Sequence, residues 1–195
     1  RDFGATGDGV TDDTESIRRA IEQIYKETEN LVDPRTRRTI YIPAGTYLTS
    51  NVISIPPYAS LQGDGPKNTT ISLQYGNLSV ANISDSAFQS GSTIGSGGAT
   101  LPDSISISGI GFTNTADEIQ YPLLNIDSAS NVVITNSLFE SNVKAGVTYP
   151  NVIEILSTAT STENVQLDNI QVLGGGNGIV NTGTTTKHVV LQNSR

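Results

Sequence analysis

Acidic side chains are the residues of this chain whose type and spacing bear most directly on chemistry. Cysteine is absent and histidine occurs once, so thiol catalysis and cysteine-ligated zinc are excluded. Cleavage of a glycosidic bond generally requires two carboxylates that lie about 5–9.5 Å apart, one on each side of the bond. The catalytic candidates are Glu140, Glu154 and Asp168. Neither a cofactor nor a bound metal ion is expected.

A repeat in the C-terminal half indicates the strands that carry these candidates. Apolar residues begin similar runs at steps of roughly 24–33 residues, the spacing of a solenoid whose strands are fixed and whose loops vary. These residues are Ile107, Ile134, Leu167 and Leu191. The same register gives a turn column of Gly109, Asn136, Asn169 and Asn193, and an apolar column of Phe112, Phe139 and Val172. Asn and Gly tolerate left-handed turns, so the turn column predicts Asn side chains hydrogen-bonded from coil to coil.

A second strand in each coil is predicted where apolar residues flank a polar one, because alternate side chains of a strand face opposite sides. The segments are 124–126, 153–155 and 180–182. Asn125, Glu154 and Asn181 would form an outward row on which carbohydrate could bind, and a solvated strand face explains this row equally well. Glu140 and Asp168 fall at different positions of their coils, so we do not expect them to stack as a pair.

The N-terminal region predicts one amphipathic helix. Asp12 is placed as an N-cap, and Glu15 completes a capping box. Apolar residues then recur on one helix face, which predicts a helix of roughly four turns over residues 13–28. They are Ile17, Ala20, Ile21, Ile24 and Tyr25. We interpret the acidic residues at this point as a helix start rather than a metal site.

The segments on either side of this helix carry a family resemblance. The glycine-containing stretch 2–14 precedes the helix and Thr39–Tyr47 follows it. This pairing resembles the opening of the pectate-lyase-like superfamily. The resemblance implies an all-β fold, a right-handed parallel β-helix (solenoid) with one N-terminal capping α-helix. We therefore expect a single domain over 1–195, with the N-terminal turn, capping helix and loop at 1–38 and β-helix coils at 39–195.

The catalytic motifs of enzymes in this superfamily are missing from the predicted coils. No Asn-Thr-Asp, Asp-Asp or Gly-His-Gly cluster of the polygalacturonase branch occurs there. Pectate lyases similar in fold use calcium and a basic residue, and neither Lys144 nor Lys187 has two carboxylates at matching positions. The segment 33–35 only superficially resembles the motif of the mannuronan epimerase branch. His188 aligns with Asn131 at a strand entry, so its expected role is structural.

Composition and charge narrow the range of partners. The net charge of −8 argues against nucleic acid, because phosphate binding requires a basic surface. No apolar run approaches the roughly 20 residues that span a bilayer, so membrane insertion is not expected. Methionine is absent and Leu191–Asn193 begins a turn that is not completed. We therefore expect a truncated segment of a longer protein, in which further coils or another chain cover this end.

Tailspikes, tail fibres, hydrolases, lyases and epimerases all share this opening, and we expect a bacteriophage tail fibre or tailspike because no catalytic cluster is recognisable, Cys, Met and Trp are absent and the charge is acidic. We expect a structural or host-glycan-contacting segment of the virion, forming a homotrimer that contacts host surface polysaccharide and other tail or baseplate proteins. The alternative is a secreted polysaccharide-degrading enzyme of the same fold, either a glycoside hydrolase or a lyase. A third reading is a bacterial surface adhesin. Paired carboxylates in a groove would mark the enzyme, whereas a trimer would mark the fibre.

Overall fold

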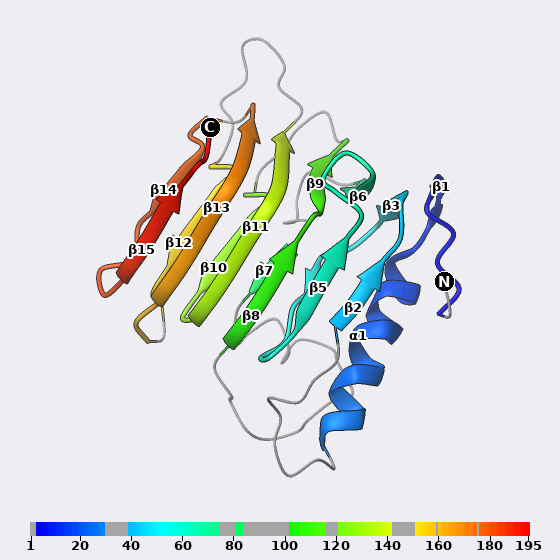
Figure 1. The fold of residues 1–195 in the computed structure, drawn as a ribbon, viewed down its shortest axis with the longest axis horizontal. Helices are drawn as coiled ribbons and strands as arrows, with labels where there is room; N and C mark the ends of the chain where they lie inside the picture. The colour runs from blue at the N-terminus through cyan, green and yellow to red at the C-terminus, as the bar shows by residue number, and fades with distance from the viewer. Residues whose placement is uncertain are drawn as a thin grey trace.

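The computed structural model describes residues 3–29, 39–74, 81–83, 102–115, 121–141, 151–158, 160–174 and 176–195. These residues form one α-helix, α1 (Thr14–Glu29), and a series of short β-strands (Figure 1). The strands are β1 (Asp8–Asp12), β2 (Thr39–Ile42), β3 (Gly45–Thr49), β4 (Ile53–Ser54), β5 (Ser60–Gly63), β6 (Thr69–Leu73), β7 (Ala81–Ile83), β8 (Asp103–Ser108), β9 (Gly111–Asn114), β10 (Leu124–Asp127), β11 (Ser130–Ser141), β12 (Ile153–Leu156), β13 (Glu163–Leu173), β14 (Ile179–Asn181) and β15 (Lys187–Gln192).

The described strands form two sheets in which every pairing is parallel. The ten-stranded sheet runs β1-β3-β6-β9-β11-β8-β5-β2, with β13 paired to β11 and β15 paired to β13. The five-stranded sheet runs β14-β12-β10-β7-β4. In Figure 1 the strands lie in a row, with α1 at one end and β15 at the other. The expected mostly-β fold of parallel strands with one helix is confirmed.

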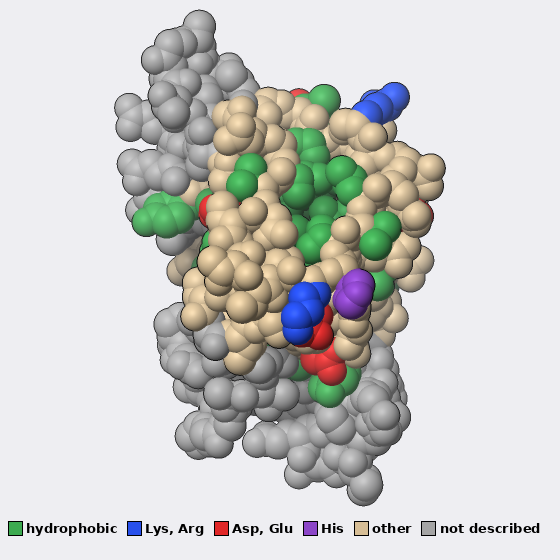
Figure 2. All heavy atoms as spheres, turned by 90° about the vertical axis from the view of Figure 1, so that its left-hand side faces the viewer, with side chains coloured by type: hydrophobic (Ala, Val, Ile, Leu, Met, Phe, Trp, Pro, Cys, Tyr) green, Lys and Arg blue, Asp and Glu red, His purple; other side chains and the backbone are tan. Residues whose placement is uncertain are grey.

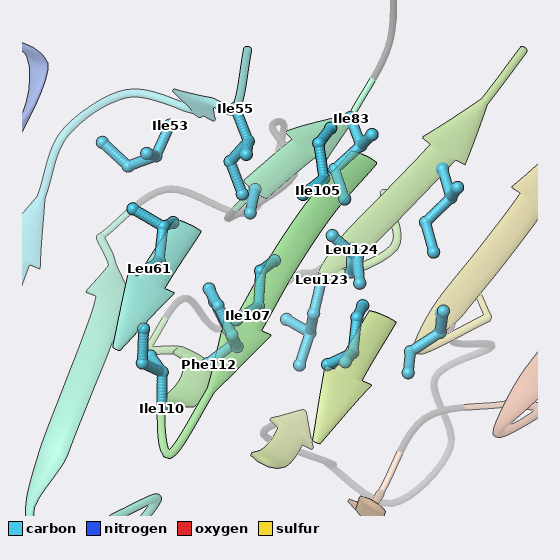
Figure 3. Close-up of a cluster of buried hydrophobic side chains, with 14 of the residues drawn as sticks. Ile53, Ile55, Leu61, Ile83, Ile105, Ile107, Ile110, Phe112, Leu123 and Leu124 are labelled. Atoms are coloured by element: carbon cyan, nitrogen blue, oxygen red, sulfur yellow. The ribbon is translucent and has the colours of Figure 1, made fainter. Parts of the chain in front are cut away.

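One hydrophobic core joins the two sheets. Ile107 and Phe112 of the ten-stranded sheet belong to the same buried cluster as Leu124 of the five-stranded sheet. Figure 3 shows these side chains pointing toward one another. The predicted repeat register is confirmed, because Ile134 lies opposite Ile107 on one side and Leu167 on the other.

The apolar column predicted from the sequence is also present. Phe139 lies opposite Phe112 in one neighbouring strand and Val172 in the other. The two phenylalanine rings stack with their centroids 5.1 Å apart and their planes inclined by 8°. The column continues toward the N-terminus through Ile71 and Tyr47. Burying each large apolar side chain stabilises the fold by about 1.5–3 kcal/mol, so this column is a major part of the core.

The predicted alignment of the second strands is correct between β10 and β12 and wrong between β12 and β14. Asn125 lies opposite Glu154, as expected. Glu154 lies opposite Val180, whereas Asn181 lies opposite Ile155. The sequence alignment of Asn181 with Glu154 is therefore wrong by one residue. The physical reason is that Ile179 takes the core position next to Ile153, which shifts the following residues of β14.

Residues in the left-handed conformation form the bends between successive strand segments. Gly109, Asn136, Asn169 and Asn193 have φ values of 69°, 49°, 52° and 51°, which confirms the predicted turn column. Asn169 Nδ2 donates a hydrogen bond to Asn136 Oδ1 at 2.7 Å, so these side chains are linked from coil to coil. Asn193 Nδ2 instead donates to the Asp168 carboxylate at 2.8 Å.

A second column of left-handed residues lies at the beginning of the long strands. Asn131, Asn164 and His188 have φ values of 54°, 55° and 52°. They share one register position, since the residues on both sides of them are paired across β11, β13 and β15. Asn164 Nδ2 donates a hydrogen bond to Asn131 Oδ1 at 3.0 Å. His188 therefore occupies the strand-entry position that the sequence assigned to it, in line with Asn131.

Helix α1 covers the N-terminal end of the core. Ile17 and Ile21 belong to the buried cluster, and Ala20 is also buried. These residues lie on the apolar helix face that was predicted. The helix spans 14–29 and thus begins and ends one residue later than the predicted range of 13–28.

The predicted capping arrangement is correct in one part: the Asp12 carboxylate accepts a hydrogen bond from the amide of Thr14, the first helical residue, at 3.0 Å. The predicted N-cap position and the capping box are wrong. The carbonyl of Asp13 accepts the first helical hydrogen bond, from the Ile17 amide at 3.0 Å, so Asp13 is the N-cap residue. Asp12 is the last residue of β1 and takes an extended conformation for this reason. Glu15 forms an ion pair with Arg18 at 3.2 Å rather than a capping box.

Carboxylates hold the N-terminal turn in place. The Asp13 carboxylate is buried and accepts hydrogen bonds from the amides of Thr6 at 2.8 Å and Gly7 at 3.0 Å. The Asp8 carboxylate accepts hydrogen bonds from the amides of Thr11 and Val10. The Thr11 amide is the largest of the causes that lower the pKa of Asp8 from 3.8 to about 2.

Acid should destabilise the fold partly through Asp8. Because its pKa is lowered in the folded state, the ionised Asp8 adds stability above about pH 4, and this contribution is lost as the pH falls to about 2. Asp8→Asn keeps an acceptor oxygen but cannot titrate. The midpoint of thermal unfolding can be measured at several pH values between about 5 and 2. It should fall less steeply with decreasing pH for Asp8→Asn than for the natural chain. Identical slopes would contradict this assignment.

The turn column should tolerate glycine better than alanine at Asn169. Alanine loses the hydrogen bond to Asn136 and must also adopt a left-handed conformation, which costs about 1–2 kcal/mol for a residue with a Cβ atom. Glycine loses the hydrogen bond but adopts this conformation without strain. Unfolding by denaturant should therefore rank Asn169→Gly above Asn169→Ala in stability. Equal losses would show that the hydrogen bond alone matters at this position.

Candidate functional site

Glu154 lies at the end of a hydrogen-bonded chain of side chains on the outer face of the five-stranded sheet. Its carboxylate accepts a hydrogen bond from Asn151 Nδ2 at 3.3 Å. Asn151 Oδ1 in turn accepts one from Asn177 Nδ2 at 2.9 Å. Glu154 and Asn151 are half-buried, and Asn177 is exposed. This set of amide and carboxylate groups presents both donors and acceptors, which suits it to binding hydroxyl groups.

Asn151 and Asn177 were not among the residues singled out from the sequence. Ile153 lies opposite Ile179, and each asparagine precedes its isoleucine by the same number of residues. The two asparagines therefore share one position in successive coils. An Asn placed shortly before an apolar strand in two successive coils is the signal from which the sequence could have identified them.

Asp168 lies on the outer face of β13 and has a structural partner. Its carboxylate accepts the hydrogen bond from Asn193 Nδ2 at 2.8 Å, which ties the last turn of the column to the preceding strand. Asp168 lies opposite Thr135 on one side and Gln192 on the other. Neither neighbour is a carboxylate, so the adjacent strands supply no acidic partner at this position.

Glu140 is exposed near the end of β11. It lies opposite Thr113 and Leu173 in the neighbouring strands. The bend formed by Asn136 separates Glu140 from the position opposite Asp168, so these two carboxylates lie on different strand segments. This placement agrees with the expectation that they do not stack as a pair.

The candidate carboxylates therefore lie on separate faces of the molecule. Glu154 belongs to the five-stranded sheet, whereas Glu140 and Asp168 belong to different segments of the ten-stranded sheet. The paired geometry of a glycosidase is not formed by these three residues. Among the described residues, no group of three or more His, Asp or Glu side chains lies close enough together to hold a metal ion.

Of the two lysines considered from the sequence, Lys187 forms an ion pair and Lys144 lies outside the described residues. Lys187 Nζ lies 2.8 Å from Glu163 Oε1. The hydrogen bond from Lys187 is the largest of the causes that lower the pKa of Glu163, and a hydrogen bond from Ser161 adds to it. Lys144 and the segment 33–35 lie outside the described residues.

An apolar cavity of about 410 Å³ lies between α1 and the first strands. It is lined, among others, by Ile17, Ile40, Tyr41 and Leu61.

Of the residues that the structure describes, none forms a helix with the length and apolar character needed to cross a membrane.

Stacked parallel strands, aligned turn residues and a helix over one end define a parallel β-helix-like protein. The family model described as Rhamnogalacturonase A/epimerase, pectate lyase-like matches residues 1–195, and the chain belongs to this family. The resemblance found at residues 2–14 and 39–47 is thus confirmed.

Phage proteins are among the relatives, as the resemblance predicted. The pre-neck appendage protein of Bacillus phage phi29 is 27% identical over 203 residues, which cover 95% of this chain and 21% of that protein. The chain therefore spans about a fifth of the length of this relative.

Solved structures show the same fold at low sequence identity. PfbA, a surface adhesin of Streptococcus pneumoniae, matches with a TM-score of 0.66 and 21% identity, covering 99% of this chain and 48% of that chain. ORF18 of Geobacillus virus E2 matches with a TM-score of 0.56 and 17% identity, covering 99% and 47%. At these identities the matches establish a shared fold, and they span about half of each matched chain.

Proposed function

We propose that this chain is a structural, host-contacting segment of a bacteriophage tail appendage and is located in the virion. The observation that carries the proposal is the similarity to a phage pre-neck appendage protein over 95% of the chain. The phage structure matched at a TM-score of 0.56 supports the same assignment at the level of the fold.

In this proposal the strands close into a right-handed solenoid, which forms a single domain over residues 1–195. The shared core of the two sheets supports closure, because side chains from both sheets pack in one buried cluster. The N-terminal turn, helix and loop (1–38) then cap the coils (39–195). Other tail or baseplate proteins and further copies of the chain are its proposed partners in the virion.

The proposed ligand is a host surface polysaccharide, and the proposed contact face is the outer face around Glu154. Amide groups of Asn151 and Asn177 lie beside this carboxylate, so the face offers donors and acceptors to sugar hydroxyls. The adjacent residue Asn125 is half-buried in the same strand row. The described strands of the five-stranded sheet contain no Lys or Arg, and hydrogen bonding without cations suits a neutral glycan better than a strongly anionic one.

The second candidate function is a polysaccharide-degrading enzyme of the same fold. The observation that favours it is the family itself, whose description names a rhamnogalacturonase and an epimerase. In that function Glu140, Glu154 or Asp168 would act with a carboxylate supplied from outside the described residues. Glu154 is the first of these to test, because Asp168 is engaged by Asn193 and Glu140 is exposed on a strand of the other sheet.

Glycan binding should depend on the amide chain beside Glu154. The double substitution Asn151→Ala/Asn177→Ala removes two groups whose hydrogen bonds are each worth about 0.5–1.5 kcal/mol, so binding should weaken on the order of tenfold. Host-polysaccharide binding by calorimetry, together with release of reducing ends, would measure this. A second variant, Glu154→Gln, tests the carboxylate itself. Its control is Glu140→Gln, which removes the same charge from another face.

The outcomes of this experiment distinguish the two functions. Weaker binding without any reducing ends supports a contact surface. Reducing ends that disappear in Glu154→Gln but persist in Glu140→Gln support the enzyme. Binding that the substitutions around Glu154 leave unchanged would rule out this face as the contact site.

The full-length protein should be a homotrimer in solution. Light scattering would give its mass directly, and a trimer would support assembly as an appendage with contacts between copies. A monomer at micromolar concentration would contradict the appendage proposal and favour the enzyme.

A further inference from the structure

The bend between β13 and β14 contains an asparagine followed by a glycine, Asn177 and Gly178. Of all the asparagines in the sequence, Asn177 alone precedes a glycine. Its side chain is exposed, and neither residue belongs to a strand. Glycine has no Cβ atom, so the Gly178 nitrogen is sterically open and the backbone around it rotates freely. An asparagine side chain in this setting can react with the main-chain nitrogen that follows it.

Hydrogen bonds to the preceding coil determine the geometry of this pair. The Asn177 carbonyl accepts a hydrogen bond from the Val152 amide at 2.9 Å. The peptide bond between the two residues is trans, so the Gly178 N–H points away from Val152. The Asn177 side chain extends toward the preceding coil, where Nδ2 donates to Asn151 Oδ1 at 2.9 Å. This hydrogen bond holds the Asn177 amide away from the Gly178 nitrogen, and breaking it frees the amide to react.

The fold does not require glycine at position 178. The φ angle of Gly178 lies outside the left-handed region. Among the described residues, a Cβ atom added there would meet only Val172 Cγ1, at the ordinary van der Waals distance of 3.6 Å. Alanine therefore fits at position 178 without strain. A variant at this position can slow the chemistry of Asn177 while the fold stays intact.

We propose that Asn177 is a site of spontaneous deamidation, with water as the co-reactant. The Gly178 nitrogen attacks Cγ of Asn177 and forms a new N–Cγ bond. The Cγ–Nδ2 bond breaks, and the proton of the Gly178 amide leaves with Nδ2 as ammonia. Water then opens the resulting cyclic imide at one of its two carbonyl carbons. Attack at Cγ gives aspartate, and attack at the main-chain carbonyl gives isoaspartate.

Aspartate at position 177 disrupts the hydrogen-bonded chain that ends at Glu154. A carboxylate only accepts hydrogen bonds, so it cannot donate to Asn151 Oδ1. If Asn151 turns its Nδ2 toward the new carboxylate, its Oδ1 faces Glu154 and the bond to Glu154 is lost. Figure 2 faces the side of the molecule where β14 and β15 lie, and most of the described surface there is hydrophobic or uncharged. The new charge therefore alters this surface.

Isoaspartate at position 177 also alters the backbone. Its main chain runs through the former side chain and is longer by a methylene group. The Val152 amide donates to the carbonyls of both Asn177 and Gly178, directly before β14 begins. The longer main chain displaces these carbonyls, so isoaspartate loosens the entry of β14 into its pairing with β12.

Peptide mass spectrometry tests the proposal on the full-length natural protein, kept folded at mildly alkaline pH and sampled over time. Deamidation replaces an NH2 group by OH, and the resulting mass gain locates the reaction. Asn164 is the internal reference, because it is also exposed and donates through Nδ2 but is followed by Val165. Asn177 should convert at least about tenfold faster than Asn164, since a β-branched residue hinders ring closure.

Two variants separate the chemistry from the structural control. Gly178→Ala should slow conversion at least about fivefold, because the added methyl group restricts the backbone and hinders attack by the nitrogen. Asn151→Ala removes the acceptor that holds the Asn177 side chain. It should speed conversion roughly two- to tenfold, the factor that corresponds to the loss of one hydrogen bond. Circular dichroism would verify that both variants fold.

Conversion of Asn177 that is no faster than that of Asn164 would overturn the proposal. An unchanged rate in Asn151→Ala would overturn the control by the hydrogen bond. The effect on glycan contact rests on the proposed function and is tested with Asn177→Asp, which should bind host polysaccharide more weakly than the natural chain. A natural chain that binds no glycan would contradict the proposed function, whereas the conversion rates would still decide the deamidation.

Discussion

Parallel pairing in register is the constraint on which the rest of this structure depends. Once β11 is aligned with β13, each residue lies directly beside its equivalent in the next coil. A side chain that suits the core at one level must therefore be matched at every level, which gives the stack of Phe112 on Phe139. The same constraint requires a left-handed residue at each bend, and Asn and Gly satisfy it with the least strain.

The outer surface follows from the same alignment. Because inward positions are committed to the core, outward positions are free to vary, and the polar residues around Glu154 come from equivalent places in successive coils. A surface built in this way is repetitive along the stack and changes by one residue at a time. In the proposed function, such an open surface would contact a repetitive ligand such as a polysaccharide along the direction in which the coils stack.

The core and the bends could be predicted from the sequence because they repeat. Ile107, Ile134, Leu167 and Leu191 are all large aliphatic residues at the same position of similar runs, so the alignment of the long strands was correct although the loops between them differ in length. The short strand β14 was aligned one residue away from its true position, since its few residues contain both Ile179 and Val180 as possible core positions. The helix cap was assigned to Asp12 because the sequence does not reveal that β1 continues to that residue.

The candidate site could be predicted only in part for a related reason. Glu154 was found from its place in a strand, but its partners Asn151 and Asn177 lie before the strands, and their repeated position two residues before Ile153 and Ile179 becomes evident only once β12 and β14 are correctly aligned. Their contacts depend on how the connecting segments enter the sheet. Such contacts are set by tertiary packing, which local spacing does not encode.

The direction of the hydrogen bonds between coils has a mechanical consequence. The ladder between β11 and β13 extends from Ser130 and Glu163 to Glu140 and Leu173, and its bonds point along the direction in which the coils stack. Tension along that direction is shared by all bonds of a ladder at once, so separating two coils requires them to break together. A lateral pull on one end of β15 would instead break its bonds one after another. The stack is therefore strong under axial load and weak under peeling from its last strand.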